Sequence, residues 1–133
     1  MIKGKIFSGM RQGGFFTSLD WVREQCQEKL NFAPFPGTLN LQVEDDCLDT
    51  VTKLKAKEGI LLMSPTPEFC HAKCFPVFIG PVRGAIVMPH AENFTKELHP
   101  AEVIEIIAPV NIKDTLSLKD GDKITVEVEE RRD

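Results

Sequence analysis

The sequence is short of three things: net positive charge, cysteine and long apolar runs. Its 133 residues carry 16 Lys and Arg against 20 Asp and Glu, a formal net charge of −4. Binding to nucleic acid depends on many Lys and Arg contacts to phosphates, so this balance disfavours such a partner. No stretch reaches the roughly 20 apolar residues of a membrane helix, and Met1 to Lys5 does not lead into a signal-peptide core. We therefore expect a cytoplasmic protein with no membrane partner.

The four cysteines are expected to stay reduced in that compartment. Cys70 and Cys74, with His71 between them, suggest a metal site, but no second Cys/His pair stands at a clear zinc-site spacing. Cys70, Ala72 and Cys74 also alternate with the two-residue period of a strand. This alternation favours core thiols over metal ligands.

What the sequence does contain is a series of short strand patterns. The length fits one domain, residues 1–133, and an apolar fraction of 42% is enough for its core. Strands are predicted at residues 2–7, 38–43, 59–63, 70–79, 82–88, 103–108 and 123–128. One clear α-helix is predicted, capped by Thr17 and ending near Leu30, before Pro34. Because strands do not alternate with helices, we expect a mainly β protein, a small closed β-barrel, and not a doubly wound parallel sheet.

Residues 8–14 break the first strand pattern with the run Ser-Gly-Met-Arg-Gln-Gly-Gly, three glycines in seven residues. Glycine lets backbone N–H groups approach a phosphate closely, and a position between a strand and a helix suits that role. The run matches neither the P-loop nor the dinucleotide-binding fingerprint. Taken alone, it favours a plain flexible turn over a phosphate site.

Residues 36–41 read Pro-Gly-Thr-Leu-Asn-Leu. Strand alternation points Leu39 and Leu41 to the core and places Thr38 and Asn40 together on the opposite face. A hydroxyl and an amide oxygen two residues apart can complete the shell of a magnesium ion whose other ligands are nucleotide phosphates and water. The alternative is two polar residues on a solvated strand face, which the spacing alone favours.

Glu105 stands inside an aliphatic run, residues 102–109. A carboxylate there either points to solvent, the default for a lone glutamate, or occupies a partly buried site with a raised pKa. In the second case it can accept a proton from a substrate hydroxyl.

These segments and several others occur in a characteristic order. They are Gly4, Ser8-Gly9 with Gly13 and Phe16, Asn31-Phe32, Pro36-Gly37-Thr38-Leu39-Asn40-Leu41, Gly84-Ala85-Ile86-Val87 with Pro89, Glu102-Val103-Ile104-Glu105-Ile106-Ile107-Ala108-Pro109 and Leu118-Lys119-Asp120-Gly121-Asp122. Together they resemble the archaeal CTP-dependent riboflavin kinase family, from about Ile2 to Val128. The Gly-Thr-Leu-Asn-Leu and Glu-Ile-Ile-Ala-Pro runs are specific only in combination.

The resemblance implies a six-stranded cradle-loop-type barrel that transfers the terminal phosphate of CTP to the 5′-hydroxyl of riboflavin, giving FMN and CDP, with Mg²⁺. It implies Thr38 and Asn40 as magnesium ligands, and Glu105 as the catalytic residue at the flavin. It places Thr95, in the loop 92–99, against the flavin as well. The implied nucleotide-binding residues are Gly9, Met10, Arg11, Gln12, Gly13, Gly14, Val110, Asn111, Ile112 and Lys113. We expect a monomer or a weak homo-oligomer.

The glycine-rich run departs from the family pattern in three places. Arg11 stands where a further glycine is usual, Gly14 where a basic residue is usual, and Phe15 where tyrosine is usual. Arg11 can reach a phosphate, or the loop can prefer another nucleotide. A kinase with altered nucleotide preference, a non-catalytic flavin- or nucleotide-binding barrel and a structural barrel are the alternatives.

Overall fold

The computed structural model describes residues 1–8, 16–66, 71–90 and 102–129. The strands of these segments are β1 (Ile2–Phe7), β2 (Leu39–Val43), β3 (Ile60–Leu62), β4 (His71–Ile79), β5 (Val82–His90), β6 (Val103–Ile107) and β7 (Lys123–Val128). The helices are α2 (Asp20–Lys29), α3 (Leu48–Lys55) and α4 (Ile112–Thr115), with a 3₁₀ turn, η1 (Asp45–Cys47). None of the helices in these segments has the length and apolar character needed to cross a bilayer.

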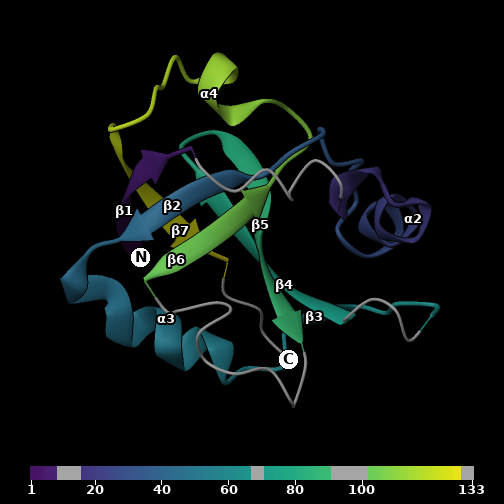
Figure 1. The fold of residues 1–133 in the computed structure, drawn as a ribbon. Helices are drawn as coiled ribbons and strands as arrows, with labels where there is room; N and C mark the ends of the chain where they lie inside the picture. The colour runs from purple at the N-terminus through teal and green to yellow at the C-terminus, as the bar shows by residue number, and fades with distance from the viewer. Residues whose placement is uncertain (9–15, 67–70, 91–101, 130–133) are drawn as a thin grey trace.

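Six of the strands close into an antiparallel barrel (Figure 1). Their order around the ring is β4-β5-β6-β2-β1-β7, and β7 returns to β4 through the pairs Val77–Val128 and Phe78–Glu127. The short strand β3 pairs with the first half of β4, outside the ring. The expected closed six-stranded barrel is therefore confirmed, and closure satisfies the strand edges that an open sheet would leave unpaired.

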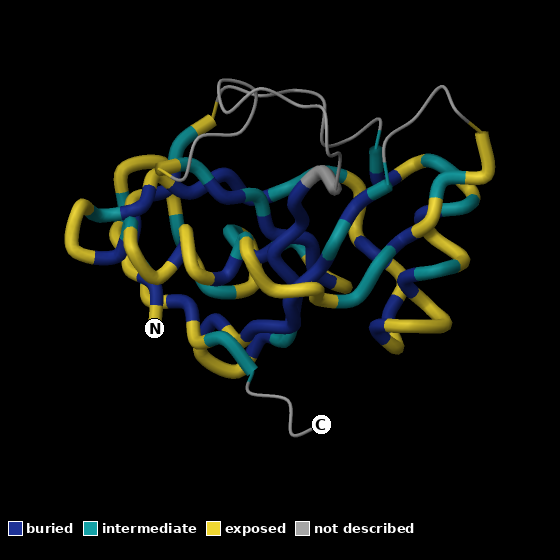
Figure 2. Tube along the Cα trace, turned by 90° about the horizontal axis from the view of Figure 1, so that it is seen from below, coloured by how far each residue is buried: buried dark blue, intermediate teal, exposed yellow. Residues whose placement is uncertain are grey.

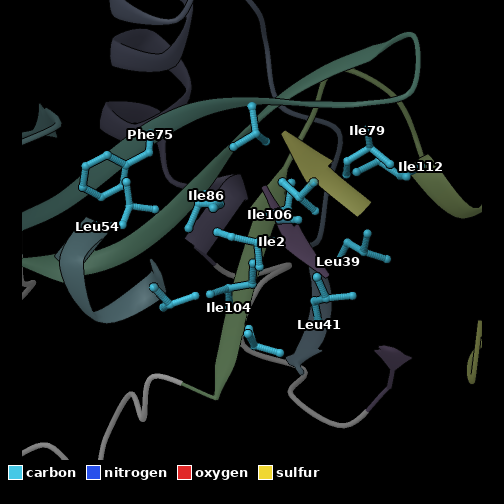
Figure 3. Packing of buried hydrophobic residues seen from close by; sticks show 14 of the residues in the cluster. Ile2, Leu39, Leu41, Leu54, Phe75, Ile79, Ile86, Ile104, Ile106 and Ile112 are labelled. Atoms are coloured by element: carbon cyan, nitrogen blue, oxygen red, sulfur yellow. The ribbon is translucent and has the colours of Figure 1, made fainter. Parts of the chain in front are cut away.

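The barrel interior is filled by the alternate residues that each strand turns inward. Leu39, Leu41 and Val43 of β2 are buried there, as strand alternation predicts. Figure 3 shows side chains from several strands meeting in this core, including Ile86 of β5 and Ile106 of β6. Burying each such side chain contributes about 1.5–3 kcal/mol. Helices α4 and α3 lie at opposite ends of the ring (Figure 1) and add side chains to the same core.

Helix α2 packs on the outside of the barrel and forms a second apolar cluster there. Val22 and Cys26 of the helix lie against Cys74 of β4, Val87 of β5 and Ile107 of β6. Figure 2 shows buried stretches, in dark blue, on this side of the molecule as well as in the barrel. Burial raises the pKa of the Cys26 thiol to about 11 and also raises that of Cys74. Cys74 is a core thiol, as expected; Cys70 lies outside the described residues.

The predicted cap of the helix is wrong. Helix α2 begins at Asp20, and its N-cap is Leu19, with no side-chain capping bond. Thr17 is buried, and its Oγ1 accepts a hydrogen bond from the backbone N–H of Gly37 at 2.8 Å. The hydroxyl therefore joins the segment before α2 to the Pro-Gly-Thr-Leu-Asn-Leu run instead of capping the helix.

The acidic stretch after β2, where the sequence analysis predicts neither a strand nor a helix, is helical. Residues 45–47 form η1, and α3 follows directly. Val51 and Leu54 of α3 are buried against the barrel core, three residues apart on one helix face. At the C-terminal end of α3, Lys73 of β4 donates hydrogen bonds to the backbone carbonyls of Lys55 and Lys57. Contacts with the barrel therefore stabilise α3, and the local sequence does not contain them.

Two glycines mark where strands beside β2 and β6 approach too closely for a side chain. A Cβ at Gly84 of β5 would lie 2.5 Å from the carbonyl oxygen of Ile107. A Cβ at Gly4 of β1 would lie 2.5 Å from the carbonyl oxygen of Gln42. Both contacts are tighter than a carbon can tolerate, so the packing around the β2–β6 pair requires glycine at these positions.

Candidate functional site

Strands β2 and β6 bring three of the sequence-predicted site residues together. Asn40 of β2 pairs directly with Glu105 of β6. Thr38, one residue before β2, donates a hydrogen bond from Oγ1 to Oε1 of Glu105 at 3.0 Å. Since Leu39 and Leu41 point inward, Thr38, Asn40 and Glu105 share the outer face of the barrel. The two expected magnesium ligands and the expected catalytic carboxylate thus form one group.

Asn40 contradicts the interpretation of this face as solvated. Only 6% of Asn40 is exposed, and its Oδ1 has no hydrogen-bond partner among the described residues. Leaving a buried acceptor unsatisfied costs about 1–3 kcal/mol, so such an atom in a native fold calls for an explanation. A ligand that this oxygen binds would supply one.

The oxygens at this site fit a magnesium ion. Mg²⁺ prefers hard oxygen ligands and keeps few from the protein when phosphates and water supply the others. Asn40 offers the unpartnered Oδ1, and Thr38 offers a hydroxyl whose hydrogen is engaged by Glu105, which leaves oxygen lone pairs for a cation. Elsewhere in the described segments, no group of three or more His, Cys, Asp and Glu is arranged to bind a metal.

A pocket of about 170 Å³ opens next to Thr38, at the end of the barrel where α4 lies. Its lining comes from residues 35–39 and from Ile106, Ala108 and residues 110–113. The backbone N–H of Phe35 donates to the carbonyl of Ala108 at 2.7 Å, which joins the two lining segments.

The nucleotide-binding residues that the resemblance implies fall in two segments, Gly9 to Gly14 and Val110 to Lys113. All four residues of the second segment line this pocket. Asn111 uses its side-chain oxygen to cap α4, accepting from the backbone N–H of Asp114 at 3.1 Å. The side chain of Ile112 is buried in the barrel core, so it offers the pocket its backbone. Of the other members of this segment, Val110 is exposed, and Asn111 and Lys113 are half-buried.

Lys113 links the pocket to the start of the glycine-rich run. Its Nζ lies 2.6 Å from Oδ1 of Asp120 and 3.2 Å from Oγ of Ser8, the residue before Gly9. Ser8 in turn donates to Oδ2 of Asp120 at 2.5 Å. The hydrogen bonds from Lys113 and Ser8 lower the pKa of Asp120. The cluster fixes the Lys113 ammonium between the pocket and Ser8, the first residue of the glycine-rich run.

Two groups of expected site residues, Gly9 to Gly14 and Thr95, lie outside the described residues. The structure also brings two residues to the site that sequence reasoning missed. Thr17 was interpreted as a helix cap, and nothing in its local pattern separates the two roles. Phe35 lines the pocket, and its position between Pro34 and Pro36 is the one signal that could have singled it out.

A family model named CTP-dep_RFKase, with the description "Domain of unknown function DUF120", matches residues 6–128. The chain belongs to this family. The resemblance that the motifs indicated is thereby confirmed over nearly the whole chain.

Several curated archaeal relatives carry the name riboflavin kinase. That of Archaeoglobus fulgidus is 41% identical over 130 residues, covering 96% of this chain and 54% of the relative. That of Pyrobaculum aerophilum is 41% identical over 128 residues, covering 94% and 59%. That of Methanosarcina barkeri is 32% identical over 140 residues, covering 98% and 57%. The chain spans between 54% and 59% of the length of these relatives.

Proposed function

We propose that residues 1–133 act as one riboflavin kinase domain, which transfers the terminal phosphate of CTP to the 5′-hydroxyl of riboflavin and releases FMN and CDP. The observation that carries this proposal is the joining of Thr38, Asn40 and Glu105 on the β2–β6 pair, beside a pocket lined by Val110 to Lys113. Membership of the family and the names of the archaeal relatives support the same activity.

Glu105 is the residue that accepts the proton of the reacting hydroxyl. The oxygen of the riboflavin 5′-hydroxyl attacks the terminal phosphorus of CTP, the bond from that phosphorus to the bridging oxygen breaks, and CDP leaves with the electron pair. A carboxylate within reach of the hydroxyl assists by taking its proton. The hydrogen bond from Thr38 to Oε1 keeps the Glu105 carboxylate in one orientation.

Thr38 and Asn40 are the residues that would hold Mg²⁺, through the hydroxyl and amide oxygens described above. When bound, the ion supplies neutralisation of the phosphate charge. Lys113 adds a positive side chain at the pocket, and the run Gly9 to Gly14, with Arg11, is proposed to hold the phosphates. Because phosphoryl transfer asks the protein mainly for positioning and charge neutralisation, this set suffices without a Walker lysine.

The decisive experiment offers riboflavin and magnesium together with each of CTP, ATP, GTP and UTP, and measures FMN by chromatography. We expect FMN with CTP and far less with the other three. If another nucleotide gives the most FMN, the kinase proposal stands and the CTP preference is wrong. The unusual Arg11 and Gly14 would then account for the altered choice of nucleotide. Absence of FMN with all four would sink the kinase proposal.

The same samples distinguish the alternative of a binding barrel. Tight riboflavin binding without turnover, measured by quenching of flavin fluorescence, would favour it. Size-exclusion chromatography of the chain with and without substrates tests the proposed monomer or weak homo-oligomer.

A further inference from the structure

Asp120, in the turn between α4 and β7, has no role in the reaction as described above, yet both of its carboxylate oxygens hold other side chains. Its Oδ1 lies 2.6 Å from Nζ of Lys113. Its Oδ2 accepts a hydrogen bond from Oγ of Ser8 at 2.5 Å. Lys113 also donates to Oγ of Ser8 at 3.2 Å, so the three side chains form a closed triangle of polar contacts.

The turn that carries Asp120 is fixed by its own hydrogen bonds and by β1. The backbone N–H of Asp122 donates to the carbonyl of Lys119 at 3.0 Å, and Oδ2 of Asp122 accepts from the N–H of Lys119 at 2.9 Å. Gly121, with φ of 94°, donates from its N–H to the carbonyl of Ile6 at 2.8 Å. The N–H of Ile6 donates to the carbonyl of Asp122 at 2.9 Å. The Asp120 carboxylate therefore projects from a turn that backbone hydrogen bonds hold in place.

The side chain of Lys113 is long, and ordering it costs conformational entropy. An ammonium has three N–H donors, and the contacts with Asp120 and Ser8 use two of them. Among the described contacts, one N–H is left for an anion in the pocket that Lys113 lines. The hydrogen bonds from Lys113 and Ser8 lower the pKa of Asp120, so its carboxylate stays ionised at neutral pH and keeps its hold on the ammonium.

A surface ion pair that only stabilises the fold is the other interpretation. Lys53 and Asp49 of α3 are such a pair, with 3.2 Å between Nζ and Oδ2 and side chains that are 75% and 79% exposed. Lys113 and Asp120 lie closer together, are 33% and 49% exposed, and share Ser8 as a third partner. A half-exposed pair still adds little to stability, because water screens it. The geometry therefore favours a role at the pocket over a role in folding.

Resting on the proposed kinase function, we infer that Asp120 is a positioning residue, which together with Ser8 holds the Lys113 ammonium at the pocket for the phosphates of the nucleotide. Asp120 acts through Lys113 and does not bind the nucleotide itself. Holding a long side chain before the ligand arrives removes the cost of ordering it on binding. The opposite possibility is competition, in which the carboxylate draws the ammonium away from the phosphates. Positioning is favoured because Lys113 lines the pocket while it is bonded to Asp120.

The test is a double-mutant cycle on Asp120 and Lys113, with magnesium present throughout. Calorimetry gives the Kd for CDP in the wild type, Asp120→Ala, Lys113→Ala and the double variant, and fluorescence quenching gives the Kd for riboflavin. Asp120→Asn keeps an oxygen acceptor for the ammonium and removes the charge. The matched control is Asp49→Ala, which also removes a carboxylate from a lysine pair and makes the same change in net charge.

We expect Asp120→Ala to raise the Kd for CDP by about threefold to tenfold, the scale of ordering one long side chain on binding. The Kd for riboflavin and the Tm should not change. In the Lys113→Ala background, Asp120→Ala should have no further effect, because the side chain that it positions is gone. Asp120→Asn should recover part of the loss, since a neutral acceptor makes a weaker hydrogen bond than a carboxylate. Asp49→Ala should bind both probes as the wild type does.

An equal loss of CDP binding in the two backgrounds would overturn the inference, because Asp120 would then act independently of Lys113. Tighter CDP binding in Asp120→Ala would overturn it in favour of competition. An unchanged Kd, with or without a lower Tm, or a wild type that binds no CDP would overturn it too. If Asp120→Ala does not fold, Asp120→Asn replaces it in the cycle, with Asp49→Asn as its control.

The same cycle is separable from the fate of the kinase proposal. CDP binding that follows the expected cycle without any FMN formation would keep the role of Asp120 at a nucleotide site and remove the kinase. FMN formation by a protein in which Asp120→Ala leaves the Kd for CDP unchanged would keep the kinase and remove the role of Asp120.

Discussion

The hydroxyl of Thr38, the residue before β2, donates a hydrogen bond to Oε1 of Glu105, in the middle of β6, at 3.0 Å. One atom, Thr38 Oγ1, therefore orients the carboxylate through its hydrogen and keeps its lone pairs for a cation. The residue proposed to hold magnesium and the residue proposed to accept the proton act as one unit, so a change to either is expected to affect both roles.

Removing the Thr38 hydroxyl should therefore disable the reaction while preserving the shape of the side chain. We expect Thr38→Val to lower kcat by about 10²-fold or more, the usual scale for losing a positioned acid–base group, and to raise the magnesium concentration needed for half-maximal rate. Thr38→Ser, which keeps the hydroxyl, should recover most of the rate. Equal kcat in Thr38→Val and the wild type would show that the bond to Glu105 has no part in turnover.

Replacing Asn40 with an apolar residue should maintain or raise the stability of the protein and abolish its activity. Its buried Oδ1 has no partner among the described residues, and an apolar side chain of similar size removes that penalty. We expect Asn40→Leu to melt at the same temperature as the wild type or higher, and to make no FMN. A clear fall in Tm, measured by circular dichroism, would contradict the account of an unsatisfied acceptor.

Thr17 should support the site from a distance through its bond to Gly37. Gly37 has φ of 107°, a conformation that L side chains rarely adopt, and it precedes Thr38 directly. We expect Thr17→Val to lower the free energy of unfolding by about 1 kcal/mol in urea titrations, because the Gly37 N–H loses its acceptor. Thr17→Ser retains the acceptor and should match the wild type.

A second measurement separates positioning from simple destabilisation in the Thr17 variants. If Thr17 positions Thr38, kcat falls in Thr17→Val at a temperature where the protein is fully folded, and the KM for riboflavin changes little. A variant with normal kcat and only a lower unfolding free energy would assign Thr17 a structural role alone.

The buried thiols should be unreactive in the folded protein. Burial raises the pKa of Cys26 to about 11, above its ordinary value, so at pH 8 the reactive thiolate is scarcer than in an exposed cysteine, and reactivity rises only as the pH nears that value. We expect iodoacetamide to leave Cys26 and Cys74 unmodified under native conditions and to label both in denaturant, by peptide mass spectrometry. Rapid native labelling of Cys26 would show that α2 detaches from the barrel.

The strands were predictable because alternation is a local property, and Leu39, Leu41 and Val43 show it directly. The same rule placed Thr38 and Asn40 on one face, but it could not say what covers that face, which is why Asn40 could be interpreted as solvated. The β2–β6 pairing that joins Asn40 to Glu105 spans 65 positions of sequence, and no local pattern indicates it.

The wrong prediction for Thr17 and the missed helix α3 have another cause, which is that both depend on contacts between residues far apart in the sequence. Thr17 fits the local pattern of a helix cap, yet its hydroxyl bonds to Gly37, twenty residues away, because the fold offers that donor. Helix α3 has few turns, and its stability comes from packing Val51 and Leu54 on the barrel and from Lys73 at its end. Short-range patterns do not contain these partners.

In the described residues, β7 and β4 close the ring through two register pairs, Val77–Val128 and Phe78–Glu127, and a backbone hydrogen bond from Glu129 to Pro76. This short junction is the seam of the ring. Counted around the ring in either direction, the β2–β6 pair is the junction farthest from that seam. Local opening begins where the fewest bonds must break, so amide protons near the seam should exchange with solvent first. The barrel can open locally at the seam. The distances among Thr38, Asn40 and Glu105, on the opposite side of the ring, then stay unchanged.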